Sequence, residues 1–145
     1  MRVRLFTLRL LQSLGLALVA YLFVCLMTAD ITQASLRLEL PSLIEPDSNS
    51  TVELLLLTVP GQLLFLLVGS FIHRRVLLNG AFVLFATMTV LLQCMRFAEA
   101  LGNTWSNTEI LGLLGINLQW LLLALSPGLA LLAALERWPG PRAAE

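Results

Sequence analysis

The chain has 145 residues, of which 58% are hydrophobic and only 12% are charged, and its formal net charge is zero. Its mean hydropathy of +0.87 is far above the value usual for a soluble domain of this length. A soluble globular fold is therefore excluded. We expect one integral membrane domain over residues 1–145, surrounded by the lipid bilayer and without a nucleic-acid partner.

Four apolar stretches are long enough to cross the roughly 30 Å of hydrocarbon, which takes about 20 helical residues. The first also fits a signal peptide, because it follows a basic start. No small-residue cleavage site stands out after Tyr21, so we expect a retained helix, with cleavage within "TADITQAS" (28–35) as the alternative. We expect Gly112, Gly115, Ala124 and Gly128 to mark close helix contacts and Pro127 to kink the last span. The sequence thus predicts an all-α membrane bundle of four transmembrane helices, with spans at about 10–29, 52–72, 76–95 and 110–135.

The basic residues predict the orientation of this bundle. Placing Arg74 and Arg75 inside the bilayer would cost about 2.5–3.5 kcal/mol each, so "FIHRRVLLNG" (71–80) is expected to be a tight turn at the membrane surface. By the positive-inside rule both termini and this turn are cytoplasmic, and the loops 30–51 and 96–109 face outward. The residues on the inner side are Arg2, Arg4, Arg9, Arg74, Arg75, Arg137 and Arg142, and only Arg37 and Arg96 lie outside.

The first outer loop contains "SLRLELPSL" (35–43), whose alternating leucines predict a short β-strand that ends at Pro41 or lies at an edge. This strand would lay its leucines on the bundle or on the lipid surface, and its free edge could bind another chain. A sequon at Asn49–Thr51 would matter only in a eukaryotic secretory pathway.

In the second outer loop we expect Arg96 to pair with Glu99 on one helix face, and Ser106, Asn107 or Thr108 to cap the next helix. Trp105 fits either the aromatic belt of the membrane interface or a binding anchor. The acidic residues of both loops either solvate the loops or form a surface for a basic partner. The candidate partner-binding residues are Arg37, Glu39, Glu45, Asp47, Arg96, Glu99, Trp105 and Glu109.

Polar residues inside the spans are few. Gln62, Gln93, Asn117 and Gln119 are expected to form hydrogen bonds between helices, with a polar cavity that opens outward as the alternative. Cys25 and Cys94 are expected to be buried thiols. The single histidine, His73, lacks partners for a metal site or a catalytic triad. Every carboxylate falls at or beyond the end of a predicted span, which disfavours an ion-coupled carrier. We therefore expect no enzyme activity, no cofactor and no metal.

In architecture the chain resembles the small four-helix inner-membrane immunity proteins of the pyocin M and colicin type, which protect bacteriocin producers. The resemblance rests on chain size, on the inner arginines and on the outer loops with "SLRLELPSL" and "NTWSNTE". It implies a non-enzymatic inhibitor that binds a protein toxin at its periplasmic face, or within the spans if the toxin forms pores. The absence of lysine and the abundance of leucine, alanine and arginine suit a bacterial inner membrane.

The alternative is an accessory structural subunit of a larger envelope complex. In that case polar positions such as Gln62 and Asn117 would face the helices of another membrane protein. The isolated chain would then be unstable, whereas an immunity protein is expected to be a stable monomer or homodimer.

Overall fold

The computed structural model describes residues 2–31, 33–38, 50–100 and 106–137, and this part of the chain is all-helical. Within these residues α2 and α3 are separated by a two-residue turn, and α5 and α6 meet at Asn117. The helices are α1 (Arg2–Ile31), α2 (Ser50–Leu56), α3 (Val59–Phe71), α4 (Arg75–Ala100), α5 (Asn107–Ile116) and α6 (Leu118–Arg137).

Four helical stretches in the described part are long and apolar enough to cross a membrane. They correspond to the four predicted spans and give the chain the make-up of a multi-pass α-helical membrane protein. The fourth is shorter than predicted, since it begins at Leu118 and leaves α5 outside it. Their bounds are Leu5–Asp30, Val52–Phe71, Arg75–Arg96 and Leu118–Arg137.

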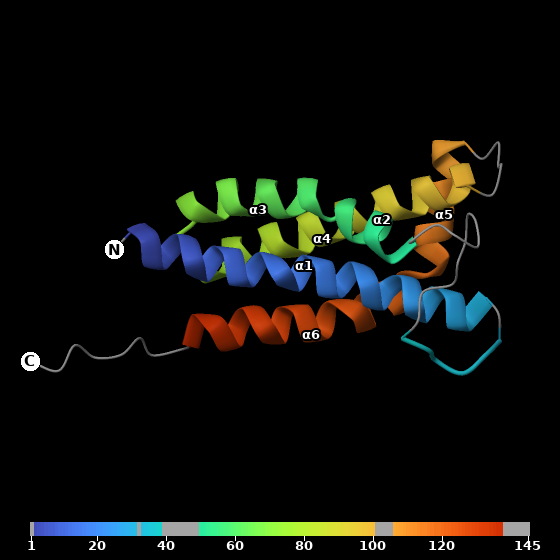
Figure 1. Cartoon of the computed structure of the whole chain (residues 1–145), viewed down its shortest axis with the longest axis horizontal. Coiled ribbons are helices and arrows are strands. Elements are labelled where there is room, and N and C mark those ends of the chain that lie inside the picture. The colour runs from blue at the N-terminus through green and yellow to red at the C-terminus, as the bar shows by residue number, and fades with distance from the viewer. Residues whose placement is uncertain (1, 32, 39–49, 101–105, 138–145) are drawn as a thin grey trace, which may run out of the picture.

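The helix α1 lies at the centre of the bundle, with α6 on one side and α3 and α4 on the other (Figure 1). More than half of its apolar stretch is buried, a larger share than in any of the other three. The start of α1, the end of α6 and the turn between α3 and α4 lie at one end of the bundle, which we call the hairpin end. The opposite end, where α1 ends and α5 begins, is called the loop end.

The phenyl ring of Phe82 fills the middle of the bundle. A Cβ atom built on Gly15 of α1 or on Gly128 of α6 would lie 3.1 Å from this ring, so both glycines let it approach their backbones. The ring of Phe65 on α3 meets it edge-on, at a centroid distance of 5.7 Å. Because these residues come from four different helices, Phe82 joins all the spans in one apolar core.

The second span is interrupted at residues 57–58, two residues before Pro60. Proline has no N–H to donate into a helix, which favours a new first turn at this place. The backbone N–H of Thr58 binds the carbonyl of Leu55 at 3.0 Å, and the carbonyl of Leu54 accepts instead from Nε2 of Gln93 at 3.4 Å. Gln93 thus bonds from α4 to α2, as the sequence predicted for a polar group within a span.

The fourth span is interrupted at Asn117, and Pro127, where the sequence predicted a kink, lies inside α6. The Asn117 side chain donates to the carbonyl of Leu113 at 2.9 Å, so it bonds within its own segment and not to another helix. At this break the chain changes its packing partner, because α5 packs on α4 whereas α6 packs mainly on α1.

The glycines predicted at close helix contacts fall into two groups. A Cβ on Gly128 would meet Val19 Cγ2 at 2.5 Å, which confirms a close approach of α6 to α1. Gly112 and Gly115 were predicted wrongly, since both are exposed and a Cβ there would meet nothing within 4 Å.

The predicted β-strand is not found in residues 35–38, and residues 39–43 lie outside the described part of the chain. After α1 the chain reverses at Gln33, which has a φ of 51°, and the N–H of Ala34 binds the carbonyl of Ala29 at 3.1 Å. The hydroxyl of Tyr21 donates to the carbonyl of Leu38, so residues 34–38 return along α1. Residues 34–37 have no regular secondary structure, and the leucines remain exposed, at 53% for Leu36 and 60% for Leu38.

Candidate functional site

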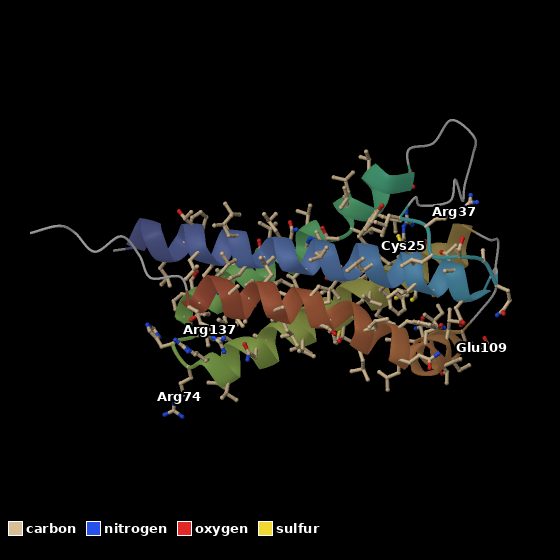
Figure 2. The ribbon with its side chains drawn as sticks, turned by 90° about the horizontal axis from the view of Figure 1, so that it is seen from below. Cys25, Arg37, Arg74, Glu109 and Arg137 are labelled. Carbon is tan, nitrogen blue, oxygen red and sulfur yellow. The ribbon has the colours of Figure 1, made fainter. Side chains whose placement is uncertain are left out.

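The loop end carries those predicted partner-binding residues that the structure describes. Arg37 and Glu109 both lie at this end and are exposed (Figure 2). Arg96 and Glu99, on the last turns of α4, are exposed as well. The other four candidates, Glu39, Glu45, Asp47 and Trp105, lie outside the described residues.

The predicted pair on α4 is present. Nη1 of Arg96 lies 2.6 Å from Oε2 of Glu99, and both side chains are exposed. Exposed pairs of this kind contribute little to stability, about 0.3–0.5 kcal/mol on a helix. The pair therefore shapes the charge of the loop end more than it holds the fold.

The start of α5 forms a capping box, which agrees with the sequence prediction of a cap at Ser106. The Ser106 backbone N–H donates to Oε2 of Glu109 at 2.7 Å, and the Ser106 hydroxyl oxygen accepts from the Glu109 N–H at 3.4 Å. Hydrogen bonds from the backbone and the hydroxyl of Ser106 lower the pKa of the Glu109 carboxyl below its ordinary value of 4.5.

We expect Ser106→Ala to destabilise α5 by about 1 kcal/mol, because the first turn loses its side-chain acceptor. Amide hydrogen exchange at Glu109 and Ile110 measures this change. The Glu109 carboxyl has a lower pKa in the folded protein than in the unfolded chain, so its contribution to stability is fully present above pH 4.5. This contribution is lost as the pH falls through the folded pKa. Protection that is unaffected by Ser106→Ala would contradict the capping role.

A cavity of about 360 Å³ opens at the loop end, between the end of α1, the returning segment and the start of α6. The reversal at Gln33 builds one wall, since it brings Ala34 and Leu36 back over the last turns of α1. Trp120 closes the opposite side, and its buried indole N–H has no hydrogen-bond partner among the residues that the structure describes. The lining residues are Leu26, Ala29, Asp30, Gln33, Ala34, Leu36 and Trp120.

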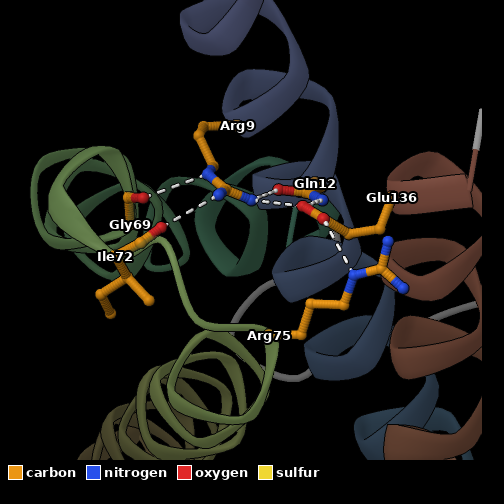
Figure 3. A network of polar contacts seen from close by, with 6 residues as sticks. All are labelled: Arg9, Gln12, Gly69, Ile72, Arg75 and Glu136. Carbon is orange, nitrogen blue, oxygen red and sulfur yellow. Dashed lines mark hydrogen bonds and ion pairs between the residues drawn. The ribbon is translucent and has the colours of Figure 1, made fainter.

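The hairpin end contains a charged network that the sequence did not predict (Figure 3). Arg9, assigned from sequence to the inner surface, is buried with only 6% of its side chain exposed, and its Nη1 lies 2.7 Å from Oε1 of Glu136. The same Nη1 donates to Oε1 of Gln12 at 2.7 Å, and Gln12 donates in turn to Glu136 at 3.0 Å. Nε of Arg75 approaches the other carboxylate oxygen of Glu136 at 3.9 Å.

Arg9 also binds the end of α3. Its Nε donates to the carbonyl of Gly69 at 3.1 Å, and its Nη2 donates to the carbonyl of Ile72 at 3.2 Å. These carbonyls lie at the C-terminus of α3, where the helix dipole favours a cation, and the Gly69 carbonyl also accepts from the Ile72 N–H at 3.3 Å. The Arg9 side chain of α1 therefore connects α3 to α6, and Arg75 connects the start of α4 to the same carboxylate of Glu136.

The pattern that could have revealed this network is the spacing of Arg9 and Gln12. The two residues are three apart, so they lie on one helix face, and they border an apolar stretch that must pack. Glu136 supplies the opposite charge at the matching end of α6. Sequence spacing alone does not show which helix ends meet, and the long-range partners could not be assigned from it.

Several polar side chains among the described residues lie in the bundle interior. Gln93 is 1% exposed, and its Oε1 has no partner among the described residues. Thr58 and Thr89 are also buried; the Thr58 hydroxyl donates from the turn to the Leu55 carbonyl of α2, and the Thr89 hydroxyl donates to the Phe85 carbonyl within α4. Asn117 is buried, while Gln62 is half-buried and Gln119 is exposed.

Cys25 and Cys94 are buried free thiols, as the sequence predicted. The ring Nδ1 of His73 lies 3.0 Å from the carbonyl of Phe71, and the side chain is exposed. In the part of the chain that the structure describes, no three His, Cys, Asp or Glu side chains gather closely enough to hold a metal ion.

Comparisons of the chain with protein-family models, with curated proteins and with solved structures found no match.

Proposed function

We propose that the protein is a non-enzymatic immunity protein of a bacterial inner membrane, which binds and neutralises a bacteriocin at its loop end. In this proposal the hairpin end is cytoplasmic and the loop end faces the periplasm. The observation that carries the proposal is the loop-end cavity, which is bordered by the exposed segment with Leu36 and Arg37. A pocket of this size can take an anchor side chain of a protein partner, and exposed charges around it can select that partner.

The contrast between the two ends supports the same function. At the hairpin end the buried charges bind one another and close the bundle. At the loop end Arg37, Arg96, Glu99 and Glu109 expose their charge at the protein surface. Accessible groups for recognition are therefore available at the loop end, whereas the rings of Phe65 and Phe82 between the two ends are fully buried.

The experiment that tests this proposal is affinity capture with the tagged full chain from the producing cells and their secreted proteins. The loop-end variant combines Arg37→Glu with the exchange Arg96→Glu and Glu99→Arg, which keeps an ion pair on α4 while reversing its direction. We expect the native chain to capture one secreted protein and the variant to bind it at least tenfold more weakly. Purified, that protein should kill sensitive cells, and expression of the native chain should protect them.

The matched control is Arg74→Glu, which reverses an exposed arginine at the opposite end. This control should capture and protect like the native chain. The inhibitor proposal fails if the captured protein is not toxic, or if the loop-end variant and the control protect equally well.

A second candidate function, an accessory subunit of a membrane complex, is favoured by one face of α5 and α6. Gly112 and Gly115 are exposed, and the amide of Gln119 is exposed without a hydrogen bond among the described residues. Small residues and unpaired amides are typical of helix contacts in membranes. Capture of integral membrane proteins only, abolished by Gly112→Leu and unchanged in the loop-end variant, would establish this function in place of the first.

A further inference from the structure

Three arginines gather on the surface of the hairpin end. Arg74 and Arg75 belong to the turn between α3 and α4, and Arg137 ends α6. The approach of Arg75 to Glu136 brings this turn beside the last residues of α6. Figure 2 shows Arg74 and Arg137 at the same end of the bundle. All three side chains are exposed.

Positive charge remains after the internal pairs are formed. Glu136 is bound at 2.7 Å by the buried Arg9, so its carboxylate is largely neutralised inside the bundle. Arg75 lies at the longer distance of 3.9 Å from the same carboxylate and is 71% exposed. Within the described ranges neither Arg74 nor Arg137 has an acidic partner. The patch therefore carries an excess of positive charge that is available to an external anion.

Large apolar side chains flank these arginines. Phe71 precedes the turn with 75% of its surface exposed, and Val76 follows it with 81% exposed. Both lie at the ends of helices long and apolar enough to span a membrane, Val52–Phe71 and Arg75–Arg96. A soluble phosphate would satisfy only the guanidinium groups. A phospholipid satisfies both parts, because its phosphate meets the arginines while its acyl chains cover the apolar side chains.

We propose that Arg74, Arg75 and Arg137 form a binding site for the headgroup of an anionic phospholipid. The guanidinium groups donate hydrogen bonds to the phosphate oxygens, as this planar cation does in many phosphate sites. This site depends on the membrane-spanning architecture and not on toxin binding, so its test is independent of the proposed function.

The test measures thermal unfolding of the full chain in detergent micelles during titration with phosphatidylglycerol or, as the uncharged comparison, phosphatidylcholine. Phosphatidylglycerol should raise the unfolding temperature of the native chain, and added salt should reduce the effect. Each arginine near an anionic surface contributes a similar amount to the free energy of lipid binding. Losing two such contributions in the double variant Arg74→Gln with Arg137→Gln should weaken the apparent lipid affinity about 30-fold. The single variants should lie between the native chain and the double variant, which provides a series if the double variant folds poorly.

The matched control is Arg37→Gln with Arg96→Gln, which removes two exposed arginines at the loop end. It should bind phosphatidylglycerol like the native chain. Equal weakening in both double variants would overturn the site, since it would show a general effect of net charge. An equal temperature rise with phosphatidylcholine, or with inorganic phosphate alone, would overturn the assignment to an anionic phospholipid.

Discussion

Replacing Glu136 with leucine is expected to destabilise the bundle by about 3–5 kcal/mol, the cost of breaking a buried ion pair from one side. In the native protein the Glu136 carboxylate lies 2.7 Å from the Arg9 guanidinium. The substitution leaves this guanidinium buried without a carboxylate partner. Arg9 keeps its bonds to Gln12 and to the end of α3, but these neutral acceptors do not balance its charge. Equilibrium unfolding in detergent micelles measures the change.

Two comparisons separate the charge effect from a general effect of substitution. The double variant Arg9→Met with Glu136→Leu removes both charges and should be more stable than Glu136→Leu alone, although it still loses the bonds to Gly69 and Ile72. Glu99→Leu removes the acid of an exposed pair and should cost about 0.5 kcal/mol or less. If Glu136→Leu and Glu99→Leu destabilise the protein equally, the network does not hold the helices together.

The second large effect is expected for Gly128→Ala, which should destabilise the protein by about 1–3 kcal/mol through overpacking. The new methyl group would lie 2.5 Å from Val19 Cγ2 and 3.1 Å from the ring of Phe82. The ring has little room to move away, because Gly15 and Phe65 confine it on other sides. Either α6 moves away from α1 or the aromatic core is rearranged.

Gly80→Ala is the matched control, since it adds the same methyl group to a helix where nothing lies within 4 Å. It should leave the stability unchanged or raise it by up to about 1 kcal/mol, the difference in helix propensity. Val19→Ala in the Gly128→Ala background should recover part of the loss by removing the nearest methyl group. The close contact of α1 and α6 is refuted if Gly128→Ala behaves like Gly80→Ala.

The sequence predicted the features that depend on local composition. Spans follow from the length of apolar runs, and the cap at Ser106 and the pair of Arg96 with Glu99 follow from spacing within one helix. The break at Asn117 was not predicted, because a polar side chain within an apolar run does not by itself indicate where a helix stops. The structure interrupts the fourth span at Asn117 and continues it through Pro127.

Only the tertiary structure decided which groups from distant parts of the chain meet. Arg9 and Glu136 are 127 residues apart, and nothing in the sequence around either one specifies the other. The loop-end cavity likewise requires the reversal at Gln33 to bring Leu36 back toward Trp120 on α6. Hydropathy therefore determined that the chain forms helices of membrane-spanning length. The packing of those helices determined which charges are buried and paired and which are free to bind a partner, because burial depends on neighbours that are distant in sequence.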